Sequence, residues 1–146
     1  MKQMKYLTLL LLAAISCQKL HKPELDDKNT LNGVKCYVYY NPENLKIYST
    51  LDMPLSGDNV SQMGPVTSIN YTFPADQQKY NAQTLKNCRL EASIPPTASL
   101  VELDASGNEL GKGIGGLRDL AGKTVYFKVV AANGEAKRYQ IRFRLN

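Results

Sequence analysis

The stretch TVYFKVVAANGEAKRYQIRFRL, from Thr124 to Leu145, decides the fold of this chain. In its second half apolar residues occupy every other position and alternate with amide or arginine side chains. This period of two predicts a β-strand with one face in a core and the other in solvent. The first half, 124–132, predicts its partner strand. The residues expected on the inward face are Val125, Phe127, Val129, Tyr139, Ile141, Phe143 and Leu145.

The turn between these strands carries Asn133-Gly134. A loop of two residues would set Phe127 opposite Gln140 and would mix the two faces, because a shift of one residue reverses every side chain. We therefore predict a loop of three residues, 133–135, which pairs Phe127 with Ile141. On the outward face this register places Tyr126 opposite Arg142, within reach of a cation–π contact.

Upstream of this hairpin the chain has short β-type runs separated by turn residues and no convincing helical period. Strands are expected at 34–40, 45–51, 66–73, 89–94 and 100–103, with a Gly-, Ser-, Asp- and Pro-rich loop before Val66. In the run 89–94, Leu90, Ala92 and Ile94 should point inward. Many short strands of this kind predict an all-β, antiparallel β-sandwich.

From Val66 to the end, the chain resembles the Ig-like, cadherin-like domains of unknown function found in Bacteroidota surface lipoproteins. The resemblance rests on the opening strand 66–71, the Ser93-Ile94-Pro95-Pro96 step and the closing pattern from Tyr126 to Tyr139. These motifs are turn and core signals, so the resemblance implies an Ig-like fold and no particular activity.

The N-terminus reads as a bacterial lipoprotein signal that ends at Cys17. Lys2 and Lys5 form a basic region, residues 6–15 form an apolar run too short to span a bilayer, and small residues precede the cysteine. This pattern predicts a signal peptide at 1–16, acylation of Cys17, and attachment to the outer membrane. We expect exposure at the cell surface, although the sequence leaves the periplasmic face open.

Residues 17–31 are polar and contain Pro23, which predicts a flexible tether ahead of a β-sandwich domain at 32–146. The domain contains Cys36 and Cys88. Two interpretations stay open at this stage: a disulfide, which an exported protein can keep, or two thiols that pack as small core residues.

Charge and residue counts exclude several functions. The leader holds two of the 18 basic residues, so the mature chain has 18 − 2 = 16 against 13 acidic residues, a net charge of +3 that does not indicate nucleic acid. His21, in the tether, is the single histidine. No nucleophile elbow or metal-ligand spacing occurs, so we expect no enzymatic activity, no metal and no cofactor. The Gly111–Gly116 stretch fits G-x-G-x-x-G but lacks a βαβ context and predicts a loop.

Two surfaces are candidates for recognition. The tyrosines Tyr37, Tyr39, Tyr40 and Tyr48 are either strand-packing residues or a platform for a partner, with Tyr37 and Tyr39 on one face and Tyr40 on the other. The outward arginines Arg138, Arg142 and Arg144 form a basic stripe. We expect a lipid-anchored binding or accessory module for an outer-membrane or cell-surface assembly. The resemblance implies a nutrient-import complex or another surface protein as partner, and the alternative is a glycan-binding lipoprotein of a polysaccharide-uptake system.

Overall fold

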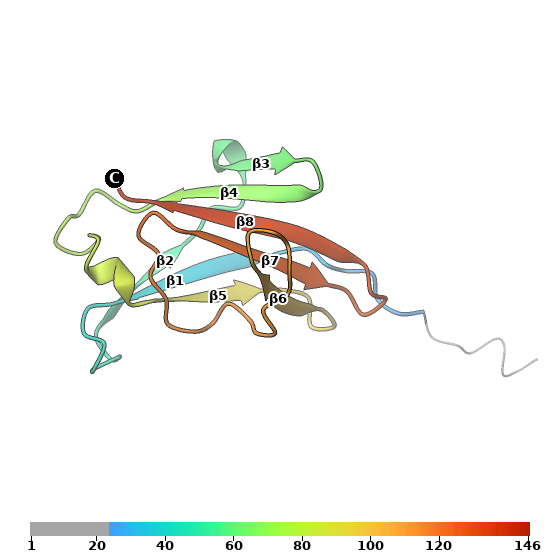
Figure 1. The fold of residues 1–146 in the computed structure, drawn as a ribbon, viewed down its shortest axis with the longest axis horizontal. Helices are drawn as coiled ribbons and strands as arrows, with labels where there is room; N and C mark the ends of the chain where they lie inside the picture. The colour runs from blue at the N-terminus through green and yellow to red at the C-terminus, as the bar shows by residue number, and fades with distance from the viewer. Residues whose placement is uncertain (1–23) are drawn as a thin grey trace, which may run out of the picture.

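The computed structural model describes residues 24–146. In it the chain folds into two stacked β-sheets (Figure 1). The smaller sheet has the strand order β2-β1-β5 and the larger sheet the order β3-β4-β8-β7-β6. Apart from two 3-10 turns, η1 and η2, regular structure in the described residues is entirely β. The predicted all-β sandwich is therefore confirmed. The elements are β1 (Gly33–Tyr39), β2 (Tyr48–Asp52), η1 (Gly57–Asn59), β3 (Val60–Met63), β4 (Val66–Thr72), η2 (Thr84–Lys86), β5 (Cys88–Ser93), β6 (Ser99–Leu103), β7 (Thr124–Val130) and β8 (Ala136–Arg144).

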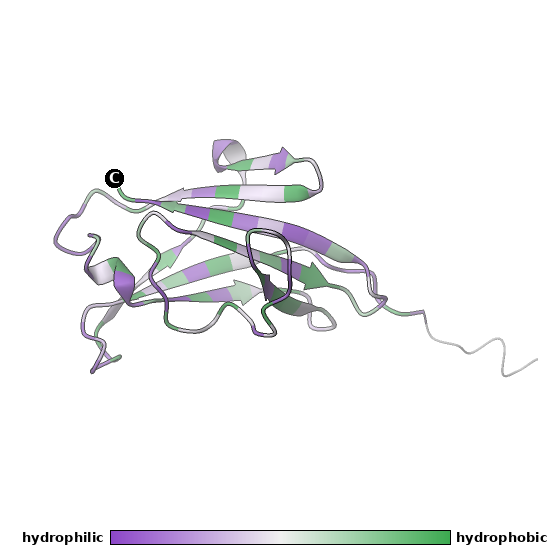
Figure 2. Cartoon of the chain, in the orientation of Figure 1, coloured by the Kyte–Doolittle hydropathy of each residue, from purple (hydrophilic) through white to green (hydrophobic). Residues whose placement is uncertain are grey.

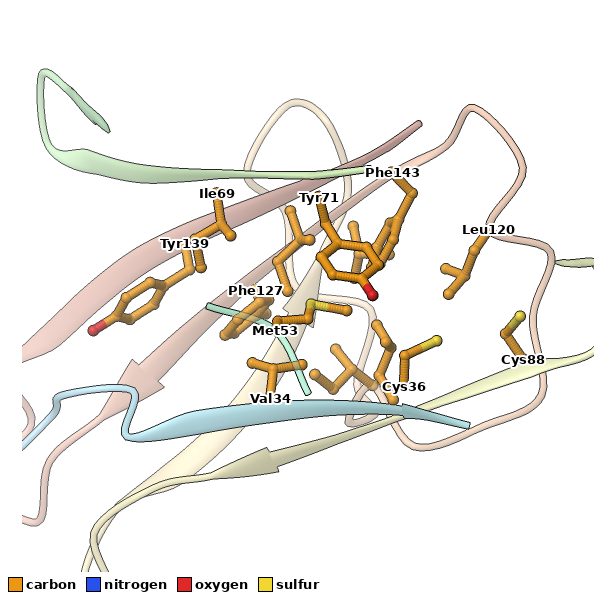
Figure 3. Close-up of a cluster of buried hydrophobic side chains, with 14 of the residues drawn as sticks. Val34, Cys36, Met53, Ile69, Tyr71, Cys88, Leu120, Phe127, Tyr139 and Phe143 are labelled. Atoms are coloured by element: carbon orange, nitrogen blue, oxygen red, sulfur yellow. The ribbon is translucent and has the colours of Figure 1, made fainter. Parts of the chain in front are cut away.

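The core lies between the sheets and is filled by alternate residues of both (Figure 3). Figure 2 shows the alternation of apolar and polar residues along β8. Leu90 is buried as predicted, and Ala92 and Ile94 pack partly against the core. Leu145 was predicted to point inward, but it follows the last residue of β8 and is 40% exposed. The main inward residues are Val34, Cys36, Val38, Ile69, Tyr71, Leu90, Val125, Phe127, Val129, Tyr139, Ile141 and Phe143.

The C-terminal hairpin has the predicted faces but a different register. Its loop has three residues, 132–134, and is closed by a hydrogen bond from the Ala131 N–H to the Glu135 carbonyl at 2.8 Å. Gly134 takes the left-handed third position, with φ +91°, as a turn followed by a glycine bulge requires. Phe127 therefore pairs with Tyr139, two residues from the predicted partner. Tyr126 lies opposite Gln140 and not Arg142, so the predicted cation–π pair is wrong.

Three further features depart from the predicted strands. The second strand begins at Tyr48, three residues later than expected. Strand β3 lies within the stretch predicted as a loop, and three of its four residues are exposed. Strand β4 pairs with β8 in parallel, which places Ile69 beside Ile141 and Tyr71 beside Phe143. The sandwich is thus rich in antiparallel pairs but contains one parallel pair.

The segment between β6 and β7, residues 104–123, covers one margin of the sandwich. Leu120 and Ile114 are buried. The backbone of Arg118 pairs with that of Cys88, with hydrogen bonds of 2.8 and 3.0 Å. The Arg118 side chain forms a two-pronged ion pair with Glu102 of β6, at 2.7 and 3.0 Å. This segment therefore connects an edge of the smaller sheet to an edge of the larger one.

Part of the predicted tether lies outside the described residues, and the described part, 24–31, contacts the sandwich. The Asn133 N–H donates to the Asp26 carbonyl at 3.0 Å, and the Thr97 hydroxyl donates to the Asp26 carboxylate at 2.8 Å. Hydrogen bonds from the Lys28 N–H and from Thr97 lower the pKa of Asp26. The Leu31 N–H donates to the Tyr139 hydroxyl, and the Leu31 side chain is buried. The described folded unit therefore includes Leu31.

Candidate functional site

Three tyrosines lie together on the outer face of the smaller sheet. Tyr37 and Tyr39 alternate with the inward residues of β1, and Tyr48 of β2 is the register partner of Tyr39. The ring centroids of Tyr39 and Tyr48 are 5.5 Å apart, and those of Tyr37 and Tyr48 are 5.6 Å apart. We call Tyr37, Tyr39 and Tyr48 the tyrosine face. None of its three residues belongs to the buried cluster between the sheets.

Charged neighbours on β5 fix the position of Tyr37. The Arg89 guanidinium lies 4.9 Å from the centre of the Tyr37 ring, and the Tyr37 hydroxyl donates to Glu91 at 3.4 Å. Tyr39 is buried beside the other two rings, whereas Tyr48 is 48% exposed. The tyrosine face therefore offers one exposed ring on a rigid support of aromatic and arginine side chains.

Tyr40 does not belong to this surface. It packs partly against the core, and its hydroxyl shares a hydrogen bond with the Ser49 hydroxyl. The sequence prediction that Tyr40 points away from Tyr37 and Tyr39 is consistent with this position.

The turn that leads into Tyr48 exposes two apolar side chains. The turn between β1 and β2 carries Leu45, 45% exposed, and Ile47, 55% exposed. Asn41 and Asn44 accept hydrogen bonds from the Glu43 and Lys46 N–H groups, at 2.9 and 3.1 Å, and so hold the turn in shape. The sequence analysis does not identify Leu45 and Ile47 as exposed, because an apolar run after a turn predicts the start of a strand.

A hollow of about 410 Å³ adjoins the same sheet where β1 begins. Lys35, Asp52 and Glu91 line it together with Gly33 and Ser93. Lys35 is the register partner of both carboxylate residues. Since Glu91 also accepts the Tyr37 hydrogen bond, the hollow and the tyrosine face form one continuous surface with an aromatic end and a charged end.

The predicted basic stripe lies on the opposite side of the molecule. Arg138, Arg142 and Arg144 alternate on β8 with residues that face the core, so they project from the outer face of the larger sheet. The structure thus separates the predicted binding residues into two surfaces on different sheets.

Cys36 and Cys88 are free thiols in the structure and are fully buried. Cys36 is the register partner of Leu90 and Cys88 that of Val38, so the cysteines are diagonal neighbours. Diagonal neighbours have Cα atoms about 7–8 Å apart, beyond the range that a disulfide spans without backbone movement. A hydrogen bond with Cys88 and burial raise the pKa of the Cys36 thiol.

We accordingly expect both thiols to stay reduced and unreactive in the folded protein. Burial and a raised pKa suppress the thiolate, which is the reactive form. An alkylating reagent should label neither cysteine in the native protein and both after unfolding without reductant. An unreduced mass lower by about two hydrogens, with no labelling after unfolding, would instead establish a disulfide.

The other residues and motifs considered in the sequence form no cluster of metal-ligating side chains in the part of the chain that is described. Within residues 24–146 no group of three or more His, Cys, Asp or Glu is placed to hold a metal ion. The Gly111–Gly116 stretch lies in the irregular segment before β7. Cys17 and His21 lie outside the described residues. No helix in the described range is long and apolar enough to cross a membrane.

Comparison with known proteins gives little further information. No family model matches the chain. No curated protein matches it. A solved structure from Bacteroides fragilis, described as a candidate secreted protein, is similar over 82% of this chain and 97% of its own, with 16% identity and a TM-score of 0.46. A similarity of this size carries no argument about function, and the fold assignment rests on the strand pairing.

Proposed function

We propose that this chain is a non-catalytic, lipid-anchored protein of the bacterial outer membrane, and that its sandwich binds a protein partner through the tyrosine face. The signal-like N-terminus and Cys17 support the anchor. The resemblance to Ig-like domains of surface lipoproteins supports a place at the cell surface and a partner in an import complex or another surface protein. We also propose, from the same resemblance, that the sandwich is Ig-like.

One observation carries the binding role: an aromatic cluster stands on the outer face of a sheet, and the turn that adjoins it exposes Leu45 and Ile47. Tyrosine and arginine are enriched among the residues that dominate protein interfaces. Here Arg89 and Glu91 hold Tyr37 in place, so less side-chain entropy is lost on binding.

The same geometry favours a protein over a neutral glycan as the ligand. Stacking on a sugar requires an open ring face. Arg89 lies over the Tyr37 ring and Tyr39 is buried, so the tyrosine face has one well-exposed ring, that of Tyr48. Exposed aliphatic side chains at Leu45 and Ile47 suit an apolar protein surface better than a sugar.

A photo-crosslinking residue at Ile47 in the native host should join the protein to one partner, identified by mass spectrometry. The same residue at Leu117, which is 52% exposed elsewhere, should not capture that partner. With the purified partner, Tyr48→Ala should weaken binding about thirty-fold, a loss of about 2 kcal/mol. Leu117→Ala is the matched control, with binding unchanged.

Equal capture from both positions would contradict the proposed interface. Binding of a neutral polysaccharide that Tyr48→Ala abolishes, in the absence of a protein crosslink, would establish the glycan-binding alternative.

The anchor has its own test. We expect the mature protein to partition into the detergent phase, because the multiple acylation typical of lipoproteins binds membranes firmly. Cys17→Ala should leave the protein unprocessed or release it into the aqueous phase. Normal processing and full membrane retention of the Cys17→Ala protein would rule out lipidation at this residue.

A further inference from the structure

The outer face of the larger sheet carries a row of cations without counter-charges. Arg138, Arg142 and Arg144 project from β8, and among the described residues none has an acidic partner within salt-bridge distance. At about 3.3 Å per residue the row extends over roughly 20 Å. We call Arg138, Arg142 and Arg144 the arginine row.

Other cations of the larger sheet and of the segment before β7 do have acidic partners. Lys128, on the same outer face, lies 2.5 Å from Glu109, and Arg118 is paired with Glu102. The outward positions on the strands that flank β8 include no acidic residue. They are Val66, Ser68, Asn70 and Thr72 on β4, and Thr124, Tyr126, Lys128 and Val130 on β7. The arginine row therefore holds three cations that no carboxylate of the flanking strands neutralises, and such a row attracts an anionic ligand.

A groove of about 140 Å³ adjoins the row at Arg138. Tyr126, Gln140 and Leu103 line it. Asp104 also lines the groove, but its carboxylate accepts hydrogen bonds from the Asn108 and Ser106 N–H groups of its own turn, at 2.8 and 2.9 Å. The groove thus presents an aromatic ring beside a guanidinium.

The position of β8 limits the kind of anion. Strand β8 lies between β4 and β7, so its backbone hydrogen bonds are already made and an acidic peptide cannot add to it as a strand. Alongside the row, β4 carries the exposed hydroxyl side chain of Thr72 and the half-buried amide of Asn70, while Ser68 is buried and accepts a hydrogen bond from the Gln140 amide. Guanidinium groups bind carboxylate and sulfate oxygens, and hydroxyl and amide groups suit a ligand rich in hydroxyls.

We propose that the arginine row, with the groove at Tyr126, is a binding site for an extended acidic polysaccharide. This site is separate from the tyrosine face and would act independently of a protein partner bound there.

Heparin is the probe, with neutral dextran and polyglutamate as comparisons and the full-length protein in detergent. We expect heparin to bind with an affinity that falls as salt rises. The triple variant Arg138→Gln/Arg142→Gln/Arg144→Gln should weaken heparin binding about thirty-fold. The control Lys46→Gln/Lys79→Gln/Lys86→Gln, which loses the same charge elsewhere, should change it less than three-fold. Tyr126→Ala should weaken heparin binding, and Tyr48→Ala should leave it unchanged.

Both triple variants should unfold at the same denaturant concentration as the wild type, since all six side chains lie on the surface or at its margin. If the control triple variant weakened heparin binding as much as the arginine triple variant, the proposal would be overturned, because net charge alone would then explain the loss. Polyglutamate binding as tight as heparin, or no heparin binding at low salt, would also overturn it.

Discussion

Phe127→Ala is expected to destabilise the domain by about 3 to 5 kcal/mol, enough to unfold much of the population at ordinary temperature. The Phe127 side chain is fully buried at the centre of β7, and its ring stacks on Tyr139 with centroids 5.4 Å apart. Alanine would leave a cavity between the sheets and remove an aromatic pair. The free energy of unfolding, from urea denaturation, measures the loss.

Leu145→Ala is the informative control. The alternation of the sequence places Leu145 on the same face as Phe143, whereas the structure leaves it 40% exposed beyond the end of β8. We expect this variant to lose less than about 1 kcal/mol. A loss at Leu145 as large as that at Phe127 would mean that β8 continues past Arg144 and buries Leu145.

The difference between Phe127 and Leu145 shows what periodicity predicts and what it does not. A period of two assigns side chains to faces, and it did so correctly for Val125, Phe127 and Val129. It does not determine where a strand stops. It also left the hairpin register two residues off, because the position of Gly134 within its loop sets the register, and a shift of two residues leaves each face unchanged.

The tyrosine face was predictable only in part. Alternation places Tyr37 and Tyr39 together, but the contact with Tyr48 depends on the pairing of β1 with β2, and the support from Arg89 depends on the pairing with β5. Strand β5 is about 50 residues away in the chain, and no local pattern specifies that pairing. Strand β3 was missed for another reason: with most of its residues exposed, it carries no apolar alternation.

No pattern in the sequence predicts the ion pair between Glu102 and Arg118. Glu102 is the register partner of Phe127, so it lies on the inward side of β6, where alternation would place an apolar residue. Its carboxylate is held by Arg118 at 2.7 and 3.0 Å, and both side chains are largely buried, with 10% and 16% exposed. Only the path of the 104–123 segment brings these residues together.

Glu102→Ala is accordingly expected to cost about 3 kcal/mol of stability, because it leaves the Arg118 guanidinium buried without its counter-charge. The Arg118 Nε atom already has no hydrogen-bond partner, so the guanidinium depends on Glu102 for its remaining bonds. Arg118 also holds the backbone of Cys88, so the loss should loosen the margin between the two sheets. The free energy of unfolding and amide hydrogen exchange at Cys88 measure these effects.

The double variant Glu102→Leu/Arg118→Met separates a charge effect from a packing effect. Replacing both partners by apolar residues of similar size removes the buried charge, so the double variant should be more stable than Glu102→Ala alone. In the double-mutant cycle built from the single variants Glu102→Leu and Arg118→Met and this double variant, the coupling should be at least about 1 kcal/mol. Lys112, whose ammonium lies 3.9 Å from Glu102 and whose side chain is 65% exposed, is the control, and Lys112→Met should change stability little. If the losses at Glu102 and Arg118 simply add, the pair does not act as a unit, and the segment 104–123 is held in place by its backbone hydrogen bonds and by Leu120 and Ile114.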